Sequence, residues 1–322
     1  MPYDTIVFIM YIERRPRKQK SGGLCLVLCI AVLGIVAASW LIRTLRTNNT
    51  VISPLAETND QKSILDFLKR KKDPDQLRTL IKKQIGSAWN NYSVYVSDFT
   101  SPFTMGINES TIFTGASVNK VPILAALYDE AQNGKVNFDR IVTLQQDDIQ
   151  DYGTGSIRYD PPGTTYSVKT LARLMAQKSD NTAAHLVANY IIGLPAVQSY
   201  VNSWHMTQTD MANNKTSNKD MEILFRKIVS GQIANPALTQ ELLGFLKDSD
   251  FEDRLPALLP KDVTVYHKVG TGVGDIHDVG VVVYGKMKYY IGILTDSVTD
   301  VDAAATLSAQ LSKIVFDYMR NH

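Results

Sequence analysis

The order in which strand-like and helix-like segments follow one another limits the folds open to this chain more than any other feature. Two segments that alternate apolar and polar residues precede a long stretch with helical periodicity, and three more follow it before a final helix over 302–319. The strand-like segments are 93–100, 104–108, 263–269, 277–285 and 288–295. Short turns join the late strands, which predicts antiparallel hairpins. We therefore expect all five strands to share one sheet, with the helical middle as an insertion.

The helical segments are separated by Gly, Pro, Asp and Asn residues. They are predicted at 117–133, 167–177, 182–192, 195–204, 218–230 and 237–247. Before the first strand, the pattern predicts a short basic helix over 63–72 and a second helix over 76–87 with Asp75 as its N-cap. With 44% hydrophobic and 20% charged residues in 322, the composition is that of a chain able to bury a core of normal size.

An uncharged apolar segment near the N-terminus, residues 22–42, is long enough to span a bilayer. A basic cluster precedes it, and the positive-inside rule then places everything after residue 43 outside the cytoplasm. The predicted parts are a cytoplasmic basic tail (1–21), a transmembrane helix (22–42), a polar linker (43–75) and a folded domain (76–322). This makes the chain a single-pass protein of the cell membrane. The alternative is a cleaved signal peptide and a secreted domain.

The composition also limits the function. The net charge of +2 argues against a nucleic-acid-binding protein. Both cysteines, Cys25 and Cys29, lie in the apolar segment, so no disulfide framework is expected downstream. The histidines lack the spacing of a zinc hydrolase, and His185 and His267 are expected to pack as structural residues.

A serine and a lysine three residues apart open the predicted helix 117–133. At a helix start, Ser117 is an ordinary N-cap residue. Ser117 and Lys120 would also share one helix face, where a neutral lysine amine would accept the serine proton and make Ser117 a nucleophile. Backbone N–H groups at the helix start would favour the negative charge that develops in such a reaction.

Two further polar segments follow in the chain. Ser179-Asp180-Asn181 falls between two predicted helices, where it would cap the second helix or offer a hydroxyl and an amide to a site. Lys268-Val269-Gly270-Thr271 lies on the first late strand. A strand lysine is normally solvated, but Gly270 permits the close approach of a backbone or a ligand. Lys268 would then hold an anionic group.

Taken in order, the three segments resemble the motif set of penicillin-recognising serine hydrolases, that is, class A β-lactamases and the related D-Ala-D-Ala peptidases. Supporting matches are Lys120-Val121-Pro122, Thr154-Gly155-Ser156 and His277-Asp278-Val279-Gly280, and the resemblance covers about residues 76–320. It implies a β-lactamase/transpeptidase-like α/β fold of the α+β kind. In that fold, helices flank an antiparallel five-stranded sheet, and the site lies between the sheet and an all-helical lobe.

The resemblance also implies roles for individual residues. Ser117 would be the acylated nucleophile and Lys120 its general base, while Ser179, helped by Lys268, would pass a proton to the leaving nitrogen. Substrate-binding residues would be Asn181, Gly270 and Thr271, and the N–H groups of Ser117 and Thr271 would form the oxyanion hole. No metal or organic cofactor is implied, because protein groups supply the whole reaction.

Two departures from the family pattern bear on the chemistry. Val269 stands where the family usually has Thr or Ser, whose hydroxyl binds the substrate carboxylate, and Thr271 is the candidate replacement on the same strand face. The stretch 205–217 lacks the glutamate that activates the deacylating water in class A β-lactamases. Its only carboxylate, Asp210, is interpreted as a turn residue before Asn213-Asn214 rather than as a substitute.

Three functions stay open on the sequence. The preferred one is a membrane-anchored serine hydrolase that opens β-lactam or related amide bonds, with slow deacylation. The second is a cell-wall D-Ala-D-Ala carboxypeptidase or penicillin-binding enzyme, and the third is a non-catalytic sensor of β-lactams or muropeptides. The expected partner is a small β-lactam or a peptidoglycan stem peptide, and the expected state is a monomer.

Overall fold

The computed structural model describes residues 71–322. The predicted tail, the transmembrane segment 22–42 and nearly all of the predicted helix 63–72 lie outside the described residues. Within 71–322, no helix combines the length and the apolar character needed to cross a bilayer.

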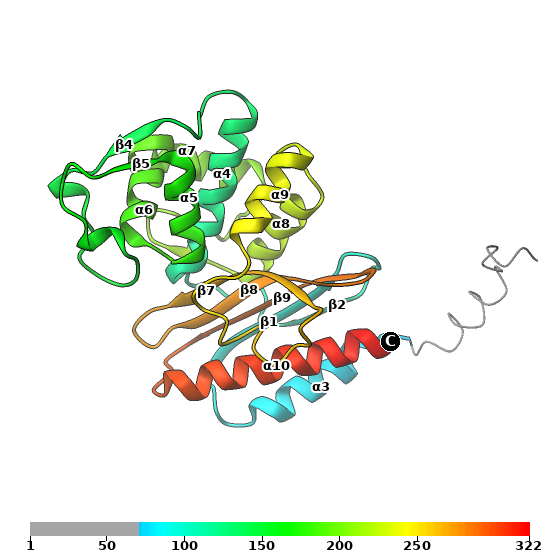
Figure 1. Ribbon diagram of the computed structural model, residues 1–322. Helices are drawn as coiled ribbons and strands as arrows, with labels where there is room; N and C mark the ends of the chain where they lie inside the picture. The colour runs from blue at the N-terminus through cyan, green and yellow to red at the C-terminus, as the bar shows by residue number, and fades with distance from the viewer. Residues whose placement is uncertain (1–70) are drawn as a thin grey trace, which may run out of the picture. The chain divides into compact units, whose positions relative to one another are not determined.

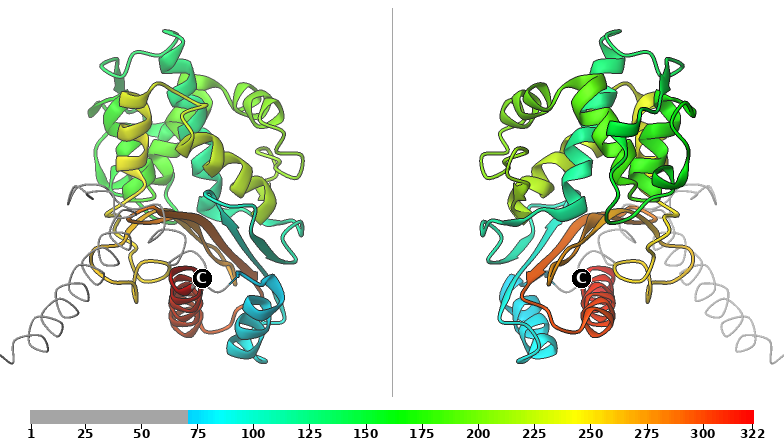
Figure 2. Two further views of the ribbon diagram at one scale, coloured as in Figure 1. Left: turned by 90° about the vertical axis from the view of Figure 1, so that its right-hand side faces the viewer. Right: turned by 90° about the vertical axis from the view of Figure 1, so that its left-hand side faces the viewer.

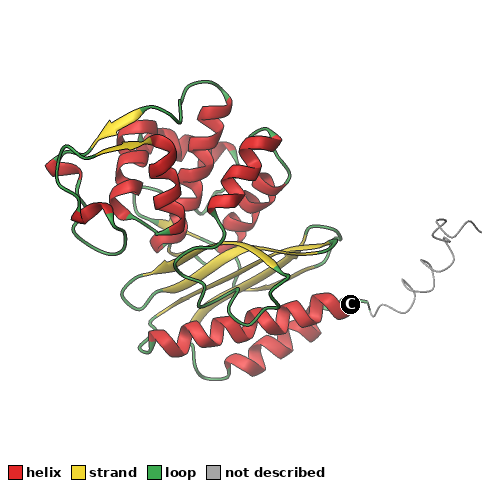
Figure 3. Ribbon diagram, viewed as in Figure 1, coloured by secondary structure: helices red, strands yellow, loops and turns green. Residues whose placement is uncertain are grey.

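An antiparallel sheet of five strands forms the middle layer of the described part (Figures 1 and 3). In spatial order the strands are β2 (Thr104–Ile107), β1 (Asn91–Asp98), β9 (Met287–Asp296), β8 (Ile276–Tyr284) and β7 (Thr264–Thr271). β1 pairs with β9 along its whole length, from Asn91 opposite Asp296 to Asp98 opposite Tyr289. The strands predicted at the two ends of the chain therefore meet in one sheet, as expected.

Helices cover both faces of the sheet, as the views in Figure 2 show. One face carries α3 (Pro74–Ile85) and α10 (Val301–Asn321), and the other faces the helical lobe. Alternate residues of β9 belong to separate cores: Tyr289 and Ile291 pack with α3 and α10, whereas Tyr290 packs with the lobe. This two-sided burial explains the uninterrupted run without polar side chains other than tyrosine from Tyr289 to Leu294 in β9.

The helical lobe is the insertion expected between the early and late strands. Its α-helices are α4 (Lys120–Gln132), α5 (Val168–Gln177), α6 (Asn181–His185), α7 (Leu194–Ser203), α8 (Asn218–Val229) and α9 (Pro236–Phe245). Single turns of 3-10 helix are η1 (Ala116–Asn119), η2 (Gln146–Asp148) and η3 (Ile157–Tyr159). The predicted helix 182–192 is divided, because α6 continues as a π-helix, η4 (Leu186–Ile192).

Two small strand pairs in the lobe were not predicted. β3 (Phe113–Thr114) pairs with β6 (Lys215–Thr216), and β4 (Ile141–Thr143) pairs with β5 (Thr165–Ser167). Strands of two or three residues are too short to show an alternating pattern, so the sequence carries no signal for them.

The helix predicted at 76–87 begins two residues earlier than the sequence suggested, as α3 at Pro74. Asp73, not Asp75, is the N-cap of α3, and its carboxylate accepts the N–H of Asp75 at 2.9 Å. Pro74 then takes the first helical position, where a missing N–H costs nothing. Lys72 forms an ion pair with Asp98 at 2.6 Å, and Asp98 is buried. Burial alone would raise the pKa of Asp98, but Lys72 and hydroxyl donors hold that pKa at about 2.

Candidate active site

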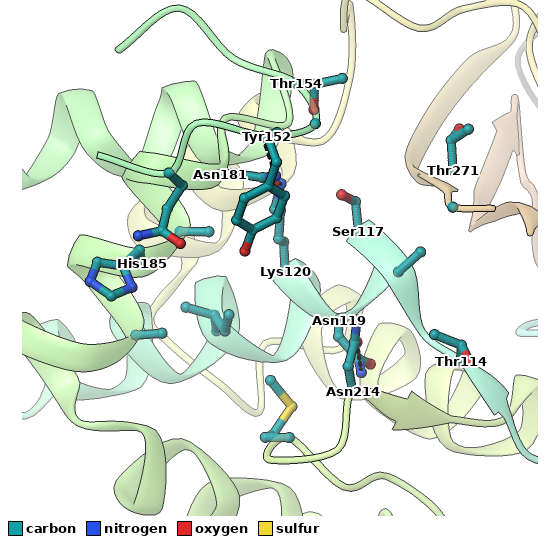
Figure 4. Close-up of a pocket in the computed structure, with 18 of the residues that line it drawn as sticks. Thr114, Ser117, Asn119, Lys120, Tyr152, Thr154, Asn181, His185, Asn214 and Thr271 are labelled. Atoms are coloured by element: carbon teal, nitrogen blue, oxygen red, sulfur yellow. Dashed lines mark hydrogen bonds between the residues drawn. The ribbon is translucent and has the colours of Figure 1, made fainter. Parts of the chain in front are cut away.

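Ser117 lies in η1, the single helical turn directly in front of α4, and lines a cavity of about 700 Å³. The residue before it, Ala116, has a φ of 45°, which non-glycine residues rarely adopt. A hydrogen bond joins this turn to the loop that precedes β6: the N–H of Gly115 donates to the carbonyl of Asn214 at 2.6 Å. Ser117 does not cap a helix with its side chain, because neither η1 nor α4 has a side-chain cap. Its hydroxyl is therefore available to the cavity (Figure 4).

Lys120 is buried one turn further along the chain. Its Nζ donates to Asn181 Oδ1 at 2.7 Å, to Ser179 Oγ at 3.2 Å and to the carbonyl of Ser179. Burial lowers the pKa of Lys120 well below 10.5, the charge of Lys268 lowers it further, and Asp180 opposes both. A lysine that loses its proton easily suits the role of general base. Within residues 71–322 no hydrogen bond joins Lys120 to Ser117; such bonds often tighten only when substrate binds.

The second motif forms the opposite wall of the cavity. Ser179 has a φ of 52°, which turns its carbonyl towards Lys120 and towards Thr154 Oγ1 at 2.8 Å. Asp180 is buried and caps α6, and its carboxylate also accepts the N–H of Ser156 at 2.7 Å. A Cβ on Gly155 would lie 2.3 Å from the Asp180 carboxyl carbon. Thr154-Gly155-Ser156 thus wraps around the second motif, which gives this supporting match a physical cause.

Asn181 lies between Lys120 and Tyr152 in the cavity wall (Figure 4). Its Oδ1 accepts from Lys120, and its Nδ2 donates to the carbonyl of Tyr152 at 2.9 Å. Gly153 is required beside it, because a Cβ there would meet the Asn181 amide nitrogen at 2.4 Å. The second hydrogen of the Asn181 amide stays available for a substrate carbonyl.

The third motif lies on β7 and supplies the remaining wall. Thr271 is exposed and lines the cavity, whereas Lys268 and Gly270 are buried and do not line it. Burial and Arg254 lower the pKa of Lys268 to about 7, while Asp278 raises it. A Cβ on Gly270 would lie 3.2 Å from the carbonyl of Gly115. Gly270 therefore lets β7 lie close to the backbone of Gly115, two residues before Ser117 in the chain.

Arg254 belongs to the site and was missed by the sequence analysis. Its guanidinium donates to Thr271 Oγ1 at 2.6 Å and to the carbonyls of Gly270 and His277 at 3.0 and 2.6 Å. Val269 is buried and does not line the cavity. Because Arg254 fills an acceptor position of the Thr271 hydroxyl, the hydroxyl hydrogen is free to donate to a ligand. Arg254 lies in a loop without periodicity or motif, so its sequence context carries no signal.

Three histidines take distinct places. Burial lowers the pKa of His267, but Asp278 at 2.9 Å and Glu252 at 3.2 Å raise it to about 9. His267 is thus a buried, charged residue beside Lys268 and not only a packing residue. His277 is buried and neutral, since burial lowers its pKa to about 4, and its Nε2 bonds to the carbonyl of Thr114 at 2.8 Å. His185 lines the far end of the cavity, with Nδ1 3.0 Å from the amide nitrogen of Asn189.

The loop that lacks the glutamate forms a tight hairpin. Asp210 accepts the N–H and the side-chain amide of Asn213 at 3.0 and 2.8 Å, which is the predicted turn role. These hydrogen bonds lower the pKa of Asp210. Asp210 does not line the cavity, although Met211 and Asn214 from the same hairpin do. The carboxylate among the residues lining this cavity is Asp275, on the turn between β7 and β8.

The site brings together a serine hydroxyl, a lysine of lowered pKa and, 3.2 Å from that lysine, a second serine hydroxyl, which are groups suited to acyl transfer to a serine. Within residues 71–322, no three His, Cys, Asp or Glu side chains are grouped to hold a metal ion. The fold and the polar groups around Ser117 define a serine hydrolase.

Comparisons with known proteins assign the family. Residues 74–319 match the model of the β-lactamase enzyme family, and the chain belongs to that family. It is 25% identical to the β-lactamase VEB-1 of Pseudomonas aeruginosa over 244 residues, which are 68% of this chain and 82% of that protein. It is 28% identical to a β-lactamase of Streptomyces albus G over 232 residues, 66% of this chain and 74% of that protein. Among solved structures, PBP-A has a TM-score of 0.72 and 25% identity, covering 79% of this chain and all of that one.

Proposed function

We propose that the chain is a membrane-anchored enzyme that is acylated at Ser117 by β-lactams or related amides and that deacylates slowly. Two arrangements support acylation: Ser117 faces the cavity, and Lys120 contacts the side chains of Ser179 and Asn181 in the second motif. Thr271, supported by Arg254, offers an N–H and a hydroxyl from the other wall.

The observation that carries the proposal is that, in the described part of the chain, the carboxylate lining this cavity is Asp275 on the β7–β8 turn, while Asp180 near Lys120 is committed to backbone N–H groups. Among the residues that line this cavity, those on the hairpin and on the nearby helices include no carboxylate; examples are Ile123, Ala184, Ala188, Leu194, Met211 and Asn214. Asp210 is held in its turn by Asn213. Without a positioned general base for water, we expect the acyl-enzyme to accumulate.

A D-Ala-D-Ala peptidase or penicillin-binding enzyme is the second candidate, and a specific likeness favours it. PBP-A aligns over its full length at 25% identity, and another of its structures, that of a point mutant, is an acyl-enzyme complex with penicillin G. If penicillin also stays on Ser117 of this chain, a peptide is the alternative natural substrate to test.

Covalent labelling of the full-length chain tests the acylation and its persistence. We expect a fluorescent penicillin to label the protein stoichiometrically, and we expect Ser117→Ala to remove the labelling. After a chase with unlabelled drug, the label should persist, and a chromogenic cephalosporin should be turned over slowly. Rapid turnover would overturn slow deacylation, and an absence of labelling would overturn acylation at Ser117.

A designed carboxylate tests why deacylation is slow. Met211 is buried against the cavity in the hairpin of Asp210. We expect Met211→Glu to speed loss of the label by about 10²-fold or more, the usual contribution of a general base. Met211→Gln, which has the same shape without a base, is the matched control. Equal deacylation rates in the two variants would contradict the proposed cause.

Anchoring rests on the uncharged segment 22–42, so it has its own test. We expect the full-length chain to stay in the membrane fraction after alkaline extraction. Mass spectrometry should show that the N-terminus has not been cleaved. Release of a shortened soluble form would support signal cleavage instead.

A further inference from the structure

The direction of β7 indicates where each part of a substrate would lie. In the proposed acylation, Lys268 and Ser179 would act on the leaving nitrogen, so the leaving group would lie towards the middle of β7. The N–H of Thr271, at the end of that strand, would then face the reacting carbonyl. The acyl substituent must therefore extend past Thr271, towards the turn between β7 and β8. That turn contributes Gly272, Val273 and Asp275 to the cavity wall.

Asp275 is a half-buried carboxylate on this path. Its side chain accepts no hydrogen bond from the residues that the structure describes, unlike the carboxylates of Asp180 and Asp210. It lies over Gly272, where a Cβ would be 2.7 Å from its Oδ2. Burial raises the pKa of Asp275, the nearby Asp296 raises it further, and Lys215 lowers it. A carboxylate with these features would be stabilised in its charged form by a cationic partner.

The neighbouring charges already have other partners. Asp296 accepts the side-chain amide of Asn91 at 2.6 Å and the hydroxyl of Ser297 at 2.9 Å. Lys215 donates to Thr114 Oγ1 at 2.9 Å, at the end of the cavity that lies away from His185 in Figure 4. Lys215 is exposed and is not within ion-pair distance of Asp275. The local charge of the three groups is therefore negative.

We propose that Asp275 binds an ammonium group on the acyl substituent of the substrate, so that the enzyme selects amine-bearing acyl donors. The proposal rests on acylation at Ser117 as set out above. An ammonium pairs with a carboxylate through a short, charge-assisted hydrogen bond, which is stronger than a neutral one when partly buried. The substrate class is an amide or β-lactam whose side chain ends in a primary amine.

A matched pair of penicillins tests this selectivity on the full-length protein. One carries a 6-aminohexanoyl side chain and the other its N-acetyl derivative, which has the same reach without the charge. We expect the free amine to acylate Ser117 about tenfold faster at low salt, the gain typical of one hydrogen bond to a charged group. The ratio of the two rate constants should fall as ionic strength rises.

Variants show which residue causes the preference for the free amine. The measured quantity is again the ratio of the two acylation rate constants, which does not depend on the fraction of active protein. Asp275→Asn should bring the ratio close to one, and Lys215→Gln should raise it, because a competing cation is removed. Asp302→Asn, an exposed residue in the first turn of α10, is the control and should keep the wild-type ratio. Equal rates for the two penicillins in the wild type, or a ratio unchanged by Asp275→Asn, would overturn the proposal. Failure of both penicillins to acylate would instead overturn acylation at Ser117.

Discussion

The immediate surroundings of Lys120 determine how Ser117 is activated. An amine buried against Ser179 and Asn181, with Lys268 acting on it, holds its proton weakly. The same contacts hold its Nζ 3.2 Å from the Ser179 hydroxyl. In the proposed mechanism, Lys120 would take the proton from Ser117, and Ser179 would pass a proton to the leaving nitrogen.

The pH dependence of acylation should follow this lowered pKa. Because the reaction needs neutral Lys120, the rate constant should be substantial at pH 7 and should fall as acid protonates the amine. Lys120→Arg, which stays charged, should lower acylation at pH 7 by about 10²–10⁴-fold. The measurement is the second-order rate of penicillin labelling from pH 5 to 10. Wild-type rates in Lys120→Arg would refute the base role.

The sequence could predict the residues of the three motifs. It could not predict the residues that contact them or complete the cavity wall. Ser117, Lys120 and Asn181 lie in motifs that are each weak alone, and the order of these motifs along the chain is what singles them out. Arg254 reaches Thr271 from a loop without pattern, and Asp275 joins the cavity only because the turn from β7 to β8 folds back over Gly272. Contacts of this kind depend on tertiary structure, which a local pattern does not encode.

At the scale of elements, β8 ties the sheet to the segment that carries the nucleophile. His277 on β8 donates from Nε2 to Thr114, and Gly270 on β7 packs against Gly115. The wall of the active site is therefore fastened to the rigid sheet at two successive residues. This arrangement suits a site that must hold a reacting carbonyl in a fixed position.

His277 predicts a loss of stability in mild acid. Its folded pKa of about 4 lies below the ordinary 6.5, so the unfolded chain binds the proton more tightly. The contribution of neutral His277 to the free energy of unfolding is fully present above pH 6.5. It is lost as the pH falls through 4, a decrease on the order of 3 kcal/mol. His277→Asn does not titrate, so urea unfolding should show a smaller loss between pH 6.5 and 4.5 than in the wild type. Equal losses would show that His277 does not act in this way.

The whole described part is organised around one sheet with a core on each face. Strand pairing and the helical insertion were predictable, because long apolar patterns of period two or near 3.6 survive in any tertiary context. The π-helix after α6 and the start of α3 at Pro74 were not, and Lys72, just before α3, pairs with Asp98, which is distant in sequence.

The contacts of Lys72 and Asp73 make the boundary of the domain testable. A fragment of residues 71–322 should be more stable to urea than one of residues 76–322, by about 2–4 kcal/mol. The shorter fragment leaves Asp98 without Lys72 and removes the Asp73 cap of α3. Lys72→Met in the longer fragment isolates the ion pair. Equal urea midpoints for the two fragments would place the boundary at residue 76 after all.

The pairing of β1 with β9 also has a consequence in time. Asn91 and Asp296 are hydrogen-bonded across a sequence separation of 205 residues. At synthesis rates of about 5–20 residues per second, β1 waits roughly 10–40 s before its partner strand exists. Until then, one edge of β1 is open to other chains. The nascent protein should therefore depend on being kept apart from its neighbours until the last strand has left the ribosome.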